Sequence, residues 1–192
     1  MPKDKNPQYF VLEAQNPKRM LLGSLKNPSL KDSWVYGRSF VKPPTKPIVV
    51  AILPGYEKAD LLDYFGTPPV ISDKFHRALV SAGVDNLDVY EAVLTSEDDS
   101  LQIKGYKAVN ILGLVAAADL GKTVFAADSD SRLLDASIEK LVIDPKKAKG
   151  LLMFRLAEYS GAVVVHESVK RAIEKQGFPH VHFNDPEDFI SL

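Results

Sequence analysis

The 192-residue sequence contains no cysteine. This absence excludes disulfides, thiolate nucleophiles, thiolate metal sites and iron–sulfur clusters. It does not indicate whether the protein works in an oxidising or a reducing compartment. Long apolar runs are also missing. The most apolar stretch, 108–118, is far shorter than the roughly 18–20 residues that cross a bilayer, and Asn110 interrupts it. The N-terminal residues have no apolar stretch behind their charges, so no secretory signal is visible. These absences predict a soluble, cytoplasmic protein with no membrane partner.

A large excess of either charge is absent too, because 24 Lys and Arg stand against 25 Asp and Glu, for a net charge of −1. This balance argues against a nucleic-acid partner bound over the whole surface. The charge is unevenly distributed, since residues 84–144 carry five basic and twelve acidic residues. An acidic segment of this kind either steers a basic partner or forms an ordinary solvated face, and the sequence leaves both open.

Proline is scarce after residue 69, because ten of the thirteen prolines lie within the first 69 residues. Proline lacks an amide donor and fixes φ, so we expect short strands and loops in the first third of the chain. Residues 59–65 fit one short helix that ends at Gly66. Apolar and β-branched runs predict strands at 9–12, 33–36, 47–53, 106–115 and 138–143, a half-buried strand at 151–159, and a basic loop at 146–150.

An internal repeat is the most informative pattern, with corresponding residues 94 positions apart throughout. Each copy has a short apolar strand, a helix with one apolar face, a glycine (Gly83 or Gly177) and a second strand. Ser72 is a favourable N-cap for the first helix, whereas His166 is a poorer one for the second. We therefore expect an α+β fold with mixed or antiparallel sheets and a twice-repeated strand–helix–strand unit. The units span about 68–94 and 162–188 of one domain, 1–192, and the sequence leaves open whether this domain has one lobe or two. Residues 1–8 are expected to be flexible.

Motifs for chemistry are weak. Gly121-Lys122-Thr123 resembles the end of a phosphate-binding loop, but the required upstream glycine is replaced by Ala116. Ser160 lacks the flanking glycine of a nucleophile elbow. His180 and His182 would share one face of a strand, and with His166 they make a histidine–metal site the second hypothesis. The residues otherwise predict no catalytic site, cofactor or metal.

Four segments form a series of structural motifs, namely 9–12, 70–72 with Phe75, Leu79 and Gly83, 106–115 with Asp119, and 154–167. The order and spacing of these motifs resemble immunity family eleven of bacterial polymorphic toxin systems. One departure is His166, where a small capping residue such as serine is expected.

The resemblance implies a non-enzymatic immunity protein that binds and neutralises a cognate toxin, such as a nuclease of the histidine–metal type, in the cytoplasm. An acidic surface would then occupy the basic groove that a nuclease presents to phosphates. The candidate contacts are Glu97, Asp98 and Asp99 in one loop and Asp128 and Asp130 in another. A third hypothesis is a scaffold or oligomerisation module, and the oligomeric state stays open.

Overall fold

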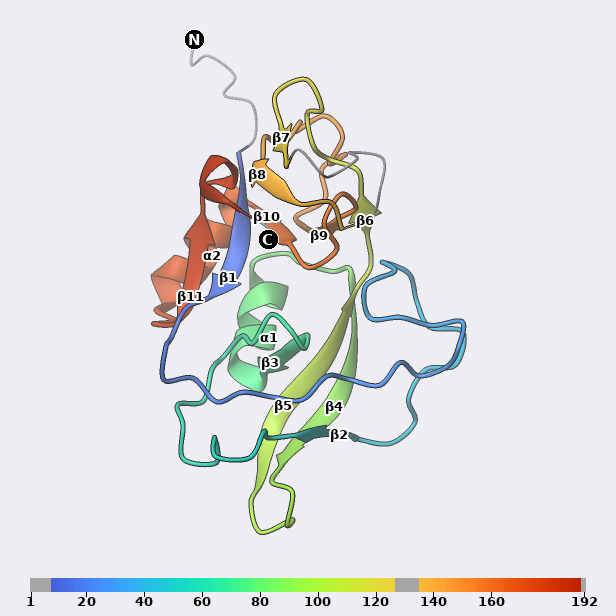
Figure 1. Cartoon of the computed structure of the whole chain (residues 1–192), viewed down its shortest axis with the longest axis vertical. Coiled ribbons are helices and arrows are strands. Elements are labelled where there is room, and N and C mark those ends of the chain that lie inside the picture. Colours follow the sequence, from blue (N-terminus) through green and yellow to red (C-terminus); the bar gives the residue numbers. More distant parts are fainter. Residues whose placement is uncertain (1–7, 127–134, 191–192) are drawn as a thin grey trace.

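The computed structural model describes residues 8–126 and 135–190. The chain alternates short strands with two helices, and most strands lie in two sheets (Figure 1). The elements of the first half are β1 (Tyr9–Ala14), β2 (Ile48–Ala51), β3 (Val70–Ser72), α1 (Asp73–Ser81), β4 (Leu87–Thr95) and β5 (Gln102–Ile111). Those of the second half are β6 (Leu114–Val115), β7 (Val124–Phe125), β8 (Ile138–Lys140), β9 (Met153–Leu156), β10 (Val163–His166), α2 (Glu167–Gln176), β11 (Val181–Asn184) and the 3-10 turn η1 (Pro186–Asp188).

The larger sheet has the strand order β11-β1-β10-β9-β6, and the second has the order β2-β4-β5-β3. Both mix parallel and antiparallel pairs, since β2 pairs with β4 and β6 with β9 in parallel while the other pairs are antiparallel. Strands β7 and β8 form a small separate ribbon. The predicted α+β class with mixed sheets is confirmed.

The two repeat units share one topology. In the first, β3 and β4 flank β5, which runs antiparallel to both. In the second, β10 and β11 flank β1 in the same way. The strands before and after each helix are therefore parallel, but they never pair directly because a third strand from outside the repeated segment lies between them.

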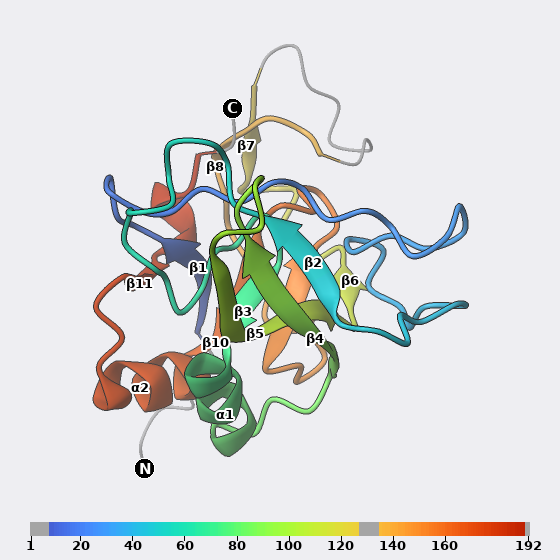
Figure 2. The ribbon, with the colours of Figure 1, turned by 90° about the horizontal axis from the view of Figure 1, so that it is seen from below.

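Helices α1 and α2 pack against each other, and Figure 2 shows them side by side. Phe75 of α1 meets Phe178, just after α2, edge to face with ring centroids 5.1 Å apart. Val169 and Ile173 of α2 lie in the same buried cluster as Phe75 and Leu79 of α1. One hydrophobic core thus joins both repeat units.

Both predicted N-caps are present. The Ser72 hydroxyl accepts a hydrogen bond from the Phe75 amide at 3.0 Å and donates one to the Asp63 carboxylate. His166 Nδ1 accepts a hydrogen bond from the Ser168 amide at 3.2 Å, so the imidazole caps α2 through a longer hydrogen bond than the one Ser72 accepts. Gly177 ends α2 in the left-handed conformation, with φ of 68°.

Replacing Ser72 by alanine is expected to lower the free energy of unfolding by about 1–2 kcal/mol, because the change removes a cap that is buried against the core. His166→Ala at the equivalent, more exposed cap is the matched control, with an expected loss of about 0.5 kcal/mol. Urea denaturation of both variants measures the difference. Equal losses at the two caps would contradict this account of the first helix.

Two predicted elements are wrong. Residues 33–36 form turns, because the Trp34 indole donates to the Lys26 carbonyl at 3.0 Å and its ring packs in the core instead of joining a ladder. Residues 59–65 form no helix. Their backbone instead covers the edge of β3, where the Ser72 amide bonds to the Asp63 carbonyl at 2.8 Å and the Phe65 amide to the Val70 carbonyl at 3.0 Å.

Three strand predictions need adjustment. All four residues of β9 are buried, so the expected half-buried alternation over 151–159 is wrong; Met153 faces one core cluster and Phe154 another. Strand β8 ends at Lys140, short of the expected 143. The predicted 106–115 strand is divided between β5 and β6, while the basic loop at 146–150 forms turns as expected.

Candidate functional site

The acidic residues Glu97, Asp98 and Asp99 lie in the turn that joins β4 to β5, and all three are exposed. These paired strands carry the turn away from the helices, and it forms the lowest point of the molecule in Figure 1. A regular two-stranded ribbon therefore presents the carboxylates at its tip. We refer to residues 96–101 as the acidic tip.

Asp98 organises the acidic tip. Its carboxylate accepts hydrogen bonds from the hydroxyls of Ser96 and Ser100, both at 2.7 Å, and from the Ser100 amide at 3.1 Å. These bonds, the Ser96 one first, lower the pKa of Asp98 to about 2. Asp99 takes a positive φ of 57° at the turn. Asp98 thus holds the shape of the tip, while Glu97 and Asp99 present charge to the solvent.

The contribution of Asp98 to the stability of the fold should decrease as the pH is lowered. A carboxyl whose pKa is lower in the folded state stabilises the fold above its unfolded value of about 3.9, and this contribution is lost as the pH falls through about 2. Between pH 5 and pH 2, we expect the wild type to lose more stability than Asp98→Asn. Urea unfolding at both pH values measures this. Equal losses would contradict a role for the ionised Asp98.

A groove of about 470 Å³ lies between the acidic tip and residues 55–58. Glu57 and Lys58 line this groove with Glu97 and Asp98. The Glu57 carboxylate accepts a hydrogen bond from the Gly55 amide at 3.2 Å. Glu57 was not among the acidic residues expected from the sequence. The only signal for it is its position just after the Pro54-Gly55 turn, which does not reveal the neighbouring tip.

Two other acidic residues of the middle segment are engaged in ion pairs. Glu91 forms an ion pair with Lys107, and Asp119 forms one with Lys122 at 2.9 Å. The remaining two predicted contact residues, Asp128 and Asp130, lie outside the described residues. Among the residues that the structure describes, the predicted acidic contacts are therefore those of the tip alone.

The three histidines of the metal hypothesis do not meet. His166 pairs with Tyr9 across β1 and β10, whereas His182 pairs with Glu13 across β1 and β11. Tyr9 and Glu13 are four residues apart on one strand, which separates the two pairs by about 13 Å. His180 is close to Asn16, with 3.4 Å between its Nε2 and the amide nitrogen. Over residues 8–126 and 135–190, no group of three or more His, Asp or Glu could hold a metal ion.

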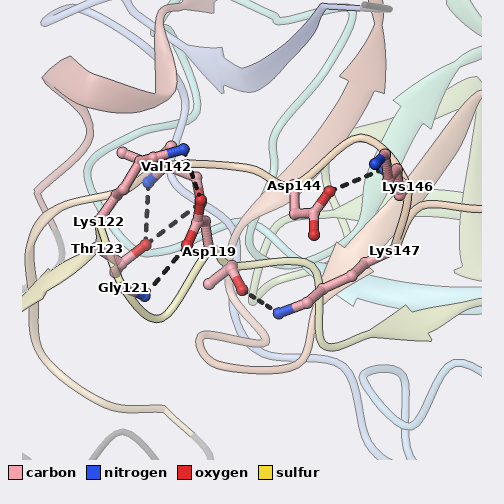
Figure 3. A network of polar contacts seen from close by, with 9 residues as sticks. Asp119, Gly121, Lys122, Thr123, Val142, Asp144, Lys146 and Lys147 are labelled. Carbon is pink, nitrogen blue, oxygen red and sulfur yellow. Dashed lines mark hydrogen bonds and ion pairs between the residues drawn. The ribbon is translucent and has the colours of Figure 1, made fainter.

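The segment 121–123 is occupied by internal contacts (Figure 3). Asp119 accepts from the Gly121 amide at 3.1 Å and pairs with the Lys122 ammonium, so this lysine is already neutralised. Thr123 exchanges hydrogen bonds with the backbone of Val142, and Lys147 donates to the Ala118 carbonyl at 2.6 Å. The network ties two loops together, which is a structural role.

Similarity to known protein families gives evidence that is independent of the geometry. A model described as "Immunity protein family (Imm11)" matches residues 52–188. The chain belongs to the Imm11 immunity protein family. No curated protein matches it. The matched region begins just after β2 and includes both repeat units and the acidic tip.

Membership of Imm11 confirms the predicted family and points to a role in toxin immunity. Immunity protein families are generally non-enzymatic and act by binding a cognate toxin. Neither helix in the described part of the chain is long and apolar enough to span a membrane.

Proposed function

We propose that this Imm11 protein binds and neutralises a cognate toxin in the cytoplasm, and that the acidic tip is a contact surface for a nuclease-type toxin. The observation that carries the proposal is the pair of exposed carboxylates, Glu97 and Asp99, at the end of a regular ribbon in a chain of an immunity family. A nuclease must attract phosphates and therefore has a positively charged groove. A projecting acidic turn is complementary to such a groove in charge and in shape.

The structure of the tip favours rapid and specific binding. Asp98 fixes the turn through its serine contacts, so Glu97 and Asp99 are held in place before the partner arrives. A preordered contact loses less entropy on binding than a flexible one does. Oriented surface charge also raises the rate of encounter with a basic partner.

Co-expression with the toxin gene next to this one tests the proposal. We expect the wild-type protein to restore growth of cells that produce the toxin and to elute with the toxin as one complex from a sizing column. Cell death together with separate elution of two folded proteins would refute it. Asp98→Asn serves as a second variant, because it alters the turn while leaving the charges of Glu97 and Asp99 in place.

Contact at a site remote from the toxin's chemistry is the alternative mode of inhibition. Competition distinguishes the two modes, because a protein seated in the basic groove prevents a short nucleic-acid duplex from binding to the inactive toxin. If the toxin binds the duplex and this protein at the same time, groove occupation is excluded while toxin binding stands.

A further inference from the structure

The four-stranded sheet is covered unevenly on the face that α1 packs against. At one end of this face, Val89 and Val109 belong to the core cluster that includes Phe75 and Leu79 of α1. At the other end, β2 lies beside β4, as Figure 2 shows, and its outward side chains are exposed. We call this second part the open face.

Three apolar residues of the open face come from β2 and the residues that follow it. Side chains alternate along a strand, so Val49, Ala51 and Leu53 point to one side while Val50 and Ile52 are buried on the other. Val49 is 70% exposed and Leu53 is 37% exposed. Val93 of β4 lies opposite Val49 in the register and is half-buried. The open face is therefore an apolar surface on a regularly paired strand.

An ion-pair cluster marks the border between the covered and open parts. Lys107 of β5 pairs with Glu91, its cross-strand partner, and its ammonium lies 3.3 Å from the carboxylate of Asp73, the first residue of α1. These charges satisfy one another at the point where the helix begins. Beyond this cluster, the open face presents the apolar side chains of Val49, Ala51 and Leu53.

The open face adjoins the acidic tip. Ala51 pairs with Thr95, the last residue of β4, and the Ile52 amide donates to the Thr95 carbonyl at 2.8 Å. Leu53 then begins the turn that leads to Glu57 in the groove beside the tip. Four carboxylates lie at this end, from Glu57, Glu97, Asp98 and Asp99, with Lys58 and Lys104 as the nearby cations.

We infer that the open face is the apolar centre of the toxin-binding surface, with the acidic tip as its charged rim. This inference rests on the proposed function and names the partner's chemistry, which is an apolar patch bordered by lysine or arginine. Protein interfaces combine an apolar centre with a polar rim, and the buried centre provides most of the binding free energy. The net negative charge of the rim determines which kind of protein covers the apolar centre.

A second copy of this chain fits the surface less well. An isologous contact places the same patch on both sides, so both copies contribute an acidic rim and neither offers the other a basic one. Such a contact lacks charge complementarity. The charge pattern therefore favours a basic partner over a homodimer.

The double variant Val49→Ser/Leu53→Ser tests the inference against a purified, catalytically inactive form of the toxin encoded by the adjacent gene. Because apolar contacts at the centre of an interface act mainly on dissociation, we expect the complex to dissociate about tenfold faster or more, with an association rate within about twofold of the wild type. Val80→Ser on α1 is the control, since Val80 is 54% exposed and lies outside the open face. It should leave both rates unchanged.

The outcomes separate this inference from the proposed function. Unchanged dissociation of the double variant, with slower association of variants at Glu97 and Asp99, would overturn the open face and retain the toxin-binding role. No complex with the wild-type protein would overturn both. A wild-type dimer on a sizing column that the double variant abolishes would also overturn the inference, because the open face would then be covered by a second copy. Urea unfolding of each variant verifies that the fold is intact.

Discussion

Changing Glu97 and Asp99 together to lysine is expected to slow association with the toxin by about ten- to a hundredfold at low ionic strength. Both side chains are exposed, and neither has a hydrogen bond that the turn requires, in contrast to Asp98. The substitution reverses the charge that would approach the partner's basic groove. Stopped-flow mixing at several salt concentrations measures the rate. The wild-type rate should fall steeply with added salt, because salt screens exposed charges.

The matched control is the double variant Asp85→Lys/Asp188→Lys. It changes the net charge by the same amount, and both residues are exposed and lie away from the acidic tip. Asp85 precedes β4, whereas the tip follows it, so the nine residues of that strand separate them by about 30 Å. A similar slowing in both double variants would assign the effect to net charge and contradict a local contact. A rate indifferent to charge and salt would exclude electrostatic steering.

Replacing Phe75 by alanine is expected to lower the free energy of unfolding by about 3–5 kcal/mol. The Phe75 side chain is fully buried and contacts Tyr64 before β3 and Phe178 after α2. Its removal leaves a cavity where the two repeat units meet, and the packed surroundings cannot fill it completely. Urea or thermal unfolding measures the loss.

Val80→Ala on the same helix is the control, because this side chain is exposed, and its expected effect is below about 0.5 kcal/mol. Phe178→Ala and the double variant complete a thermodynamic cycle. If the repeat units share one core, the two phenylalanines should be coupled by about 0.5–1.5 kcal/mol. Additive losses would contradict that shared core.

The repeat units illustrate how far the sequence determines the fold. Local signals were sufficient for the elements themselves: Ser72 and His166 begin the helices, and Gly177 ends the second. The insertion of β5 and β1 between the strands of each unit was not predictable, because it depends on pairing between distant segments. The same limit explains the error at residues 59–65, where the edge of β3 provides backbone partners in place of a helical turn.

The candidate site shows a similar division. The acidic character of Glu97 and Asp99 was visible in the sequence, and so was their place in a loop. The contribution of Glu57 and the exposure of Val49 were not visible, because both depend on how β2 lies against β4. An apolar residue in a strand is normally expected to be buried, and the exposure of Val49 is visible only in the structure.

Titration of the purified toxin with this protein tests the central claim, that neutralisation occurs by binding alone. Toxin activity should fall in proportion to the protein added, reach zero at a fixed molar ratio, and remain constant with time. Complete loss of toxin activity at a small fraction of that ratio, progressing with time and abolished by His166→Ala, would show turnover and contradict the account.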